Sequence, residues 1–160
     1  MTALGATVLA AIRRYFAPLF RQYGFHEVGT HDDLNFASLT AKSRSQYFRI
    51  SCDFRDRFCT ATVGQVKEGV VPPVPIAPAR TPSDVREISG AILAWASTGD
   101  KATAFAAGSY EEEPPDELAA AIQRLAAIFE IHGQPLLTGD QREWEKLAEV
   151  TVTRHVGTGL

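Results

Sequence analysis

The stretch from Gln46 to Val63, QYFRISCDFRDRFCTATV, carries the clearest periodicity in this 160-residue chain. From Gln46 to Phe54, apolar residues alternate with mixed ones, which is typical of an antiparallel sheet covered on one face. A turn centred between Arg55 and Asp56 places the inner residues of the two strands opposite one another in a consistent register. The stretch therefore predicts a β-hairpin whose inner pairs are Cys52–Cys59, Ile50–Ala61 and Phe48–Val63.

Helical and strand patterns flank this hairpin in a simple order. An apolar stripe at steps of three and four runs from Val8 to Tyr23, which predicts an amphipathic helix that Pro18 kinks. Further strands are expected over residues 34–41 and 58–66, and helices from 81 to 99, from 114 to 133 and from 140 onward. Because the strands run together and do not alternate with helices, the class is α+β. We predict an N-terminal helix, an antiparallel meander of three or four strands, and two or three C-terminal helices packed on one face of the sheet.

A single domain accounts for the whole length, residues 1–160. Residues 1–70 form the helix and the β-meander, residues 71–82 a proline-rich connector, residues 83–153 the helical part, and residues 154–160 a tail. Five of the nine prolines lie in the connector. It is expected to run extended over the surface, because proline disfavours both helix interiors and central strands.

The composition is that of an ordinary globular protein. Hydrophobic residues make up 45% and charged residues 22%, and a net charge of −3 argues against both a disordered tail and a general polyanion binder. Arg13 and Arg14 follow the first apolar segment, whereas a secretory signal carries its charges in front. No window reaches the roughly 18 apolar residues that a spanning helix needs. We therefore expect a cytoplasmic protein with no membrane partner, in which Cys52 and Cys59, although close enough for a disulfide, are free buried thiols.

The polar residues contain no established catalytic motif. The chain has no phosphate-binding glycine loop, no nucleophile elbow and no helical histidine pair for zinc. His26, His31 and Asp32 form one short polar cluster, which could serve acid–base catalysis or bind a metal and is equally typical of a solvated turn. We expect no catalytic residue, no metal and no cofactor, and we keep a small enzyme that uses this cluster as an alternative.

Basic residues are concentrated around the predicted hairpin. Six of them lie between residues 42 and 67, against two acids: Lys42, Arg44, Arg49, Arg55, Arg57 and Lys67. Arg49 is expected on the outer sheet face with Tyr47 and Phe58, and Arg55 and Arg57 at the tip. Such a surface could bind nucleic acid or nucleotides, form a protein contact, or simply solvate the sheet and protect its edge. An exposed face bearing Tyr47 and Phe58 would also suit a homodimer.

The charges are distributed unequally along the chain. Residues 1–110 hold 12 Lys or Arg and 9 Asp or Glu, whereas residues 111–160 hold 4 and 10. The near-neutral total therefore conceals a basic sheet-bearing half and an acidic helical half. Each half offers a candidate binding surface, and the sequence leaves open which one forms the contact. The candidate residues are Tyr47, Arg49, Arg55, Arg57 and Phe58 in the basic half and Glu111, Glu112 and Glu113 in the acidic half.

The run from Gln134 to Leu147, QPLLTGDQREWEKL, carries a resemblance. It resembles the Leu-Leu-x-Gly-Asp-x-x-x-Trp-x-x-Leu ending of small uncharacterised bacterial proteins, whose size and layout are similar to single-domain immunity proteins that neutralise toxins. The absence of a catalytic motif and the two oppositely charged halves predict a non-enzymatic module that binds another protein. The resemblance implies that this partner could be a toxin, and it brings no catalytic residues. The acidic helices or the Arg/Tyr sheet face would form the contact, since opposite charge favours association.

Overall fold

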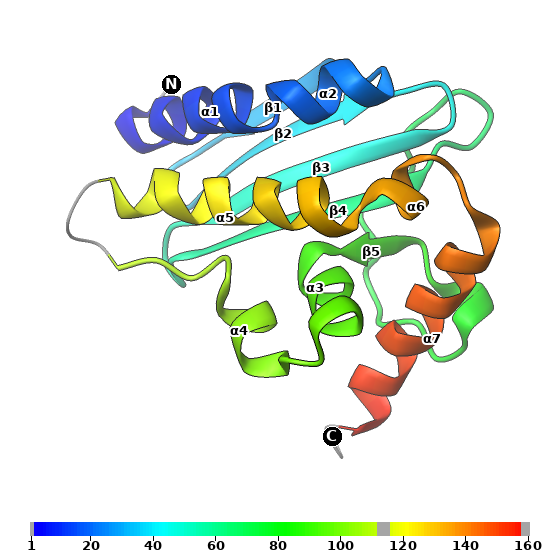
Figure 1. The fold of residues 1–160 in the computed structure, drawn as a ribbon. Coiled ribbons are helices and arrows are strands. Elements are labelled where there is room, and N and C mark those ends of the chain that lie inside the picture. Colours follow the sequence, from blue (N-terminus) through cyan, green and yellow to red (C-terminus); the bar gives the residue numbers. More distant parts are fainter. Residues whose placement is uncertain (1, 112–115, 158–160) are drawn as a thin grey trace.

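Five strands form one antiparallel sheet in the order of the chain (Figure 1). The computed structural model describes residues 2–111 and 116–157, with side chains as far as residue 154. The strands are β1 (His26–Asp32), β2 (Phe36–Lys42), β3 (Gln46–Asp53), β4 (Phe58–Gln65) and β5 (Glu87–Ser89). The α+β class and the antiparallel meander predicted from the sequence are confirmed, with β5 as one strand more than expected.

The register of the central hairpin is the one that the sequence predicts. Cys52 lies opposite Cys59, Ile50 opposite Ala61 and Phe48 opposite Val63. All six side chains are buried on the inner face of the sheet. A shift by one residue would turn this apolar set toward the opposite face, so burial of one face determines the pairing.

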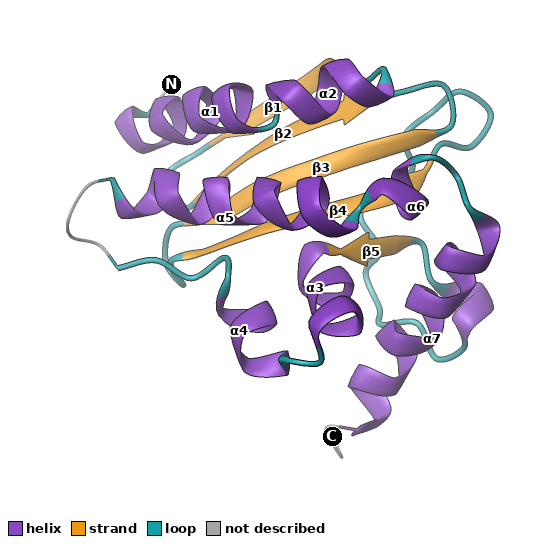
Figure 2. Cartoon of the chain, in the orientation of Figure 1, coloured by secondary structure: helices purple, strands orange, loops and turns teal. Residues whose placement is uncertain are grey.

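Helices cover the inner face of the sheet (Figure 2). The first two are α1 (Ala3–Tyr15) and α2 (Ala17–Tyr23), which meet at an angle of 49° and confirm the predicted kink near Pro18. Beside them lie α5 (Glu117–His132) and the short α6 (Gln134–Leu137). Phe48 of β3 joins the two layers, because its ring packs edge-on against Phe16 at 5.7 Å and Phe129 at 5.0 Å.

The segment from Thr81 to Gly99, predicted as one helix, is divided in the structure. It forms a 3₁₀ turn, η1 (Pro82–Asp84), then β5, then α3 (Gly90–Thr98). The helix begins at Gly90 because the Ser89 hydroxyl accepts the Ile92 N–H at 3.2 Å, which satisfies a donor that the helix leaves open. The boundary predicted near Thr81 is therefore wrong, whereas the end at Gly99 is confirmed.

The remaining helices lie beyond the β5 edge of the sheet. They are α4 (Lys101–Ala106) and α7 (Gln141–Gly157). Asp140 accepts the N–H groups of Arg142 and Glu143 and confirms the predicted start of α7. The helix continues to Gly157, so residues 154–157 are not the frayed tail that the sequence suggested, and residues 158–160 lie outside the described part.

Within residues 2–111 and 116–157, no single helix is long and apolar enough to cross a membrane. The bent pair α1 and α2 reaches that length and composition together. Its apolar side chains, among them Leu9, Ile12 and Leu19, are buried in the core of the protein.

Candidate functional site

A buried polar network occupies the outer face of the sheet. The Glu87 carboxylate accepts hydrogen bonds from the Tyr47 hydroxyl at 2.6 Å, from Arg49 at 2.7 Å and from the Thr62 hydroxyl at 3.2 Å. A second nitrogen of Arg49 donates to the backbone oxygen of Pro72 at 2.8 Å. The Arg49 and Glu87 side chains are only 15% and 12% exposed. This network fastens the start of the proline-rich connector to the sheet.

Tyr47 is completely buried in this network, so its predicted exposure is wrong. Its ring lies over Gly64, the residue directly opposite on β4, where an added Cβ would collide with the ring. Burial, followed by the hydrogen bond to Glu87, raises the pKa of the Tyr47 hydroxyl above its ordinary value. A fully buried tyrosine cannot contact a partner, and the homodimer face expected from Tyr47 and Phe58 loses its main aromatic residue.

Residues 71–81 of the proline-rich connector form neither helix nor strand and lie mostly at the surface, where they display an apolar ridge. We define the ridge as residues 70–76, in which the apolar side chains of Val70, Val74 and Ile76 are 64%, 61% and 103% exposed. Residues 73–78 make no hydrogen bond within the described part of the chain. Solvent-exposed apolar side chains grouped in one short segment often mark a contact surface, whereas scattered ones need no explanation.

The tip of the hairpin lies next to the acidic segment. The Tyr110 N–H donates to the Arg57 backbone oxygen at 3.1 Å, which places Glu111 near the tip that also carries Arg55. Glu112 and Glu113 fall outside the described residues. Glu111 and the basic hairpin tip, expected on two separate contact surfaces, therefore lie at the same end of the described molecule.

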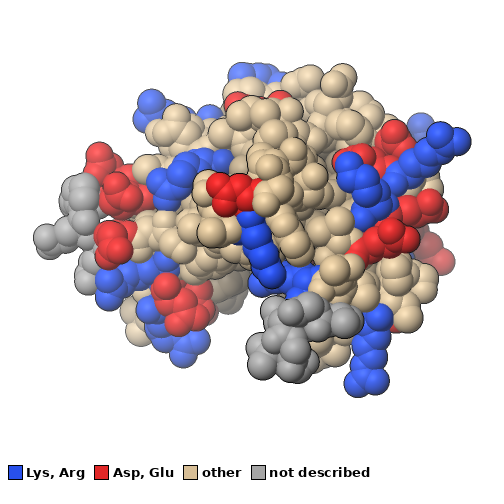
Figure 3. All heavy atoms as spheres, turned by 60° about the horizontal axis from the view of Figure 1, so that its bottom comes forward, with Lys and Arg blue, Asp and Glu red and all other residues tan. Residues whose placement is uncertain are grey.

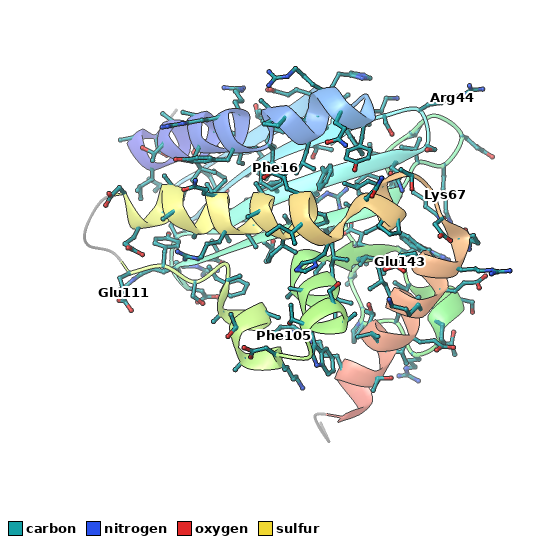
Figure 4. All side chains as sticks on the ribbon, viewed as in Figure 1. Phe16, Arg44, Lys67, Phe105, Glu111 and Glu143 are labelled. Atoms are coloured by element: carbon teal, nitrogen blue, oxygen red, sulfur yellow. A yellow bond between two sulfur atoms is a disulfide. The ribbon has the colours of Figure 1, made fainter. Side chains whose placement is uncertain are left out.

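The predicted basic surface is divided between the two ends of the sheet. Arg55 and Arg57 lie at the hairpin tip, Arg49 is neutralised by Glu87, and Lys42, Arg44 and Lys67 lie at the other end. Figure 4 shows Arg44 and Lys67 at that end and Glu111 at the opposite one. Eight residues of β3 separate the ends, roughly 26 Å at 3.3 Å a residue. No continuous Arg/Tyr face for nucleic acid remains among the described residues.

The described side chains of the C-terminal helices also form no patch of one sign. Figure 3 shows the face formed by the lower side of Figure 1, where basic and acidic side chains are interspersed around uncharged ones. On α7, Lys146 pairs with Glu143 at 3.5 Å. Lys101 of α4 lies over the Trp95 ring of α3 at 4.8 Å, and Arg154 of α7 lies over the Phe105 ring of α4 at 4.2 Å. Basic side chains thus accompany the acidic ones on these helices.

Cys52 and Cys59 form a disulfide on the inner face of the sheet. The expectation of two free thiols is therefore wrong, and the predicted register explains why, because it holds the two residues directly opposite one another. The bond is buried, and the Cys59 N–H donates to Gly108, where an added Cβ would collide with the Cys59 backbone. Disulfides are rare in a reducing cytoplasm, so the expected localisation loses one of its supports.

The histidine cluster is not assembled as a catalytic site. Asp32 accepts hydrogen bonds from the Thr2 N–H and hydroxyl and so anchors the start of α1. His31 lies 2.9 Å from Asp33, and His26 lies at the other end of β1. The hydrogen bond to His31 lowers the pKa of the Asp33 carboxyl, and both side chains of this pair are exposed. Among the described residues, no group of three His, Cys, Asp or Glu side chains could hold a metal ion.

Two structural features escaped the sequence analysis. Glu87 has no local signal, because its partners Tyr47 and Arg49 lie about forty residues earlier. The other is a polar cavity of about 520 Å³ at the Lys42 end of the sheet. Gly64 opposite Tyr47 was the one available signal for a covered outer face, since a glycine inside a strand often marks a close approach.

Comparisons with protein-family models, with curated proteins and with solved structures find no match. The function therefore has to be argued from the residues of this chain.

Proposed function

We propose that the chain is a non-enzymatic module that binds another protein. The observation that carries this proposal is the apolar ridge, residues 70–76, presented on a segment whose start is held by Arg49 and Glu87. The prolines at 72, 73 and 75 restrict the backbone of the ridge, so it has less conformational freedom to lose when a partner covers it. The resemblance to single-domain immunity proteins makes a toxin the first partner to test, with this chain as its inhibitor.

The test is a capture experiment from the source cell with the wild-type chain and the variant Val74→Ser/Ile76→Ser. Both side chains are exposed, so the variant is expected to fold normally. A matched control is Leu34→Ser, which removes an equally exposed apolar side chain from the turn between β1 and β2. We expect the wild type and the Leu34→Ser control to capture a partner protein that the ridge variant does not capture. Identical captured proteins for all three chains would contradict the proposal.

A second measurement is possible if a neighbouring gene encodes a toxin. If the gene beside this one encodes a toxin, co-expression of this chain is expected to restore growth. The ridge variant is expected to restore it less well than the Leu34→Ser control. Equal protection by both variants would remove the ridge as the contact surface.

A further inference from the structure

Proline recurs at every third position of the connector. Pro72, Pro75 and Pro78 are three residues apart, and four of the seven residues from 72 to 78 are proline. A polyproline II helix has three residues per turn and rises about 3.1 Å per residue, so in that conformation these three prolines lie on one edge, about 9 Å apart. The neighbouring residues then fall on two further edges: Val74, Ala77 and Arg80 on one, and Pro73, Ile76 and Ala79 on the other.

The segment can adopt this conformation without breaking a hydrogen bond. Residues 73–78 are exposed and make no hydrogen bond within the described part of the chain. The chain bends at Ile76 and Ala77, and nothing bonded has to be released when this bend straightens. Residues 74–79 also line a cavity of about 340 Å³, whose other wall comes from residues 84–87 and Thr151 of α7. The segment therefore stands away from the body of the protein, where a partner can reach it.

The two ends of the segment determine which edges a partner can contact. The Pro72 oxygen accepts a hydrogen bond from Arg49, and Ala79 is half-buried against the core. The edge that contains Ala79 therefore faces the protein at that end. The two edges left for a partner are the proline edge and the edge that ends in Arg80.

Arg80 adds a positive charge to a surface that is otherwise apolar and poor in donors. Its side chain is exposed and makes no ion pair or hydrogen bond within the described part of the chain. Because proline has no N–H, the segment presents carbonyl acceptors and apolar rings with few donors. The same lack of donors makes a strand of another sheet a poor partner. A complementary surface has aromatic side chains against the prolines, indole or hydroxyl donors for the carbonyl groups, and a carboxylate opposite Arg80.

We propose that residues 72–80 bind, as a polyproline II helix, in an aromatic-lined groove of the partner that carries an acidic residue at one end. The inference rests on the proposed function and adds the chemistry of the partner's contact surface. It also ranks the side chains of the ridge, because Val74 lies on a contacting edge and Ile76 lies on the edge turned away from the groove. A general apolar contact would depend more on Ile76, which is 103% exposed against 61% for Val74.

The test is a titration of the isotopically labelled full chain with an SH3 domain that reads Pro-x-x-Pro segments followed by arginine. Binding is followed through backbone amide resonances, and we expect saturable shifts within residues 74–80. Val74→Ser is expected to weaken binding about tenfold, the scale of one buried apolar side chain, and Ile76→Ser less than that. Leu34→Ser, which removes an exposed apolar side chain outside the connector, is expected to leave the affinity unchanged.

The charge at the end of the segment is tested in the same titration. Arg80→Ala is expected to weaken binding about tenfold or more, the scale of one charge-assisted hydrogen bond. Arg44→Ala is the matched control, because Arg44 is also exposed and makes no ion pair or hydrogen bond within the described part of the chain. The affinity of this control is expected to equal that of the wild type.

Three outcomes would each overturn the inference. They are the absence of saturable shifts within residues 74–80, an Arg80→Ala affinity equal to that of the wild type, and a loss in Ile76→Ser as large as that in Val74→Ser. The capture experiment with the ridge variant does not depend on any of them. A chain that captures its partner through the ridge but fails this titration would keep the proposed function and lose the polyproline mode of binding.

Discussion

Glu87 connects three parts of the outer sheet face that are distant in the sequence. Its carboxylate accepts hydrogen bonds from Tyr47, Arg49 and Thr62, and Arg49 reaches on to Pro72. A buried ion pair has a small net effect on stability compared with apolar residues, but removal of one partner leaves an uncompensated charge. Removal of Glu87 alone is therefore expected to destabilise the protein, whereas replacement of both partners by apolar residues is expected to have a small effect on stability.

We expect Glu87→Ala to lower the free energy of unfolding by about 3–5 kcal/mol, because Arg49 stays buried without its carboxylate. The measurement is urea unfolding followed by circular dichroism. The double variant Arg49→Met/Glu87→Leu is expected to recover most of the loss. A double variant as unstable as Glu87→Ala would mean that the ion pair itself supplies net stability.

The raised pKa of Tyr47 predicts that the folded protein loses stability at alkaline pH. Its folded pKa is raised, so between the unfolded pKa, about 10, and the folded value the unfolded chain releases a proton that the folded chain keeps. The stabilisation is therefore complete below pH 10 and is lost as the pH rises further. Tyr47→Phe is expected to flatten this decline in urea unfolding measured from pH 9 to pH 11. An equally steep decline in Tyr47→Phe would contradict the assignment.

Tyr47 and Arg49 show how much of a residue's environment can be predicted from the sequence. Alternation along β3 correctly predicts that Tyr47 and Arg49 face away from Phe48 and Ile50. It cannot predict that this face is covered, because the cover comes from Pro72 and Glu87, which are brought there by the tertiary fold. Period two reports which side chains share a face and carries no information about what lies on that face.

Among the elements, those with a strong local pattern are predicted well from the sequence. Short elements that depend on tertiary contacts are not. The hairpin of β3 and β4 has eight residues in each strand and a buried face, so its register follows from the sequence alone. β5 has only three residues, and Val85, Ile88 and Ile92 also fit helical spacing. Its pairing with Thr62, Val63 and Gly64 of β4 settles the choice in favour of a strand, which is a contact that no local window contains.

For the candidate sites, too, local patterns predict some features and the surroundings decide others. The Cys52–Cys59 pairing follows from the register, whereas its oxidation state depends on the surroundings of the chain and was expected incorrectly. The basic residues from Lys42 to Lys67 look like one surface in sequence, but an antiparallel hairpin sends the residues of its tip and those of its open end in opposite directions. Proximity in the sequence is therefore a poor guide to a common surface when a long hairpin intervenes.

For the molecule as a whole, the segments that stabilise the fold differ from the segment that we propose for recognition. The core lies between the inner sheet face and the helices, and the outer face is tied down as far as Pro72. Residues 73–78 lie beyond both, since all six are exposed and none makes a hydrogen bond within the described chain. The fold therefore does not require their particular side chains, although the proposed partner does.

This separation predicts that residues 73–78 can be replaced by glycine and serine at little cost to folding. Pro72, Ala79 and the network of Arg49 and Glu87 remain unchanged in that variant. We expect the free energy of unfolding to fall by no more than about 1–3 kcal/mol, because the three exposed prolines lose only their restraint on the unfolded chain, about 0.4–1 kcal/mol each. Urea unfolding should give the same dependence on denaturant, which follows the surface exposed on unfolding. A loss comparable to that of Glu87→Ala would show that the connector belongs to the folded core, and the ridge would then be a structural element whose exposure has no bearing on binding.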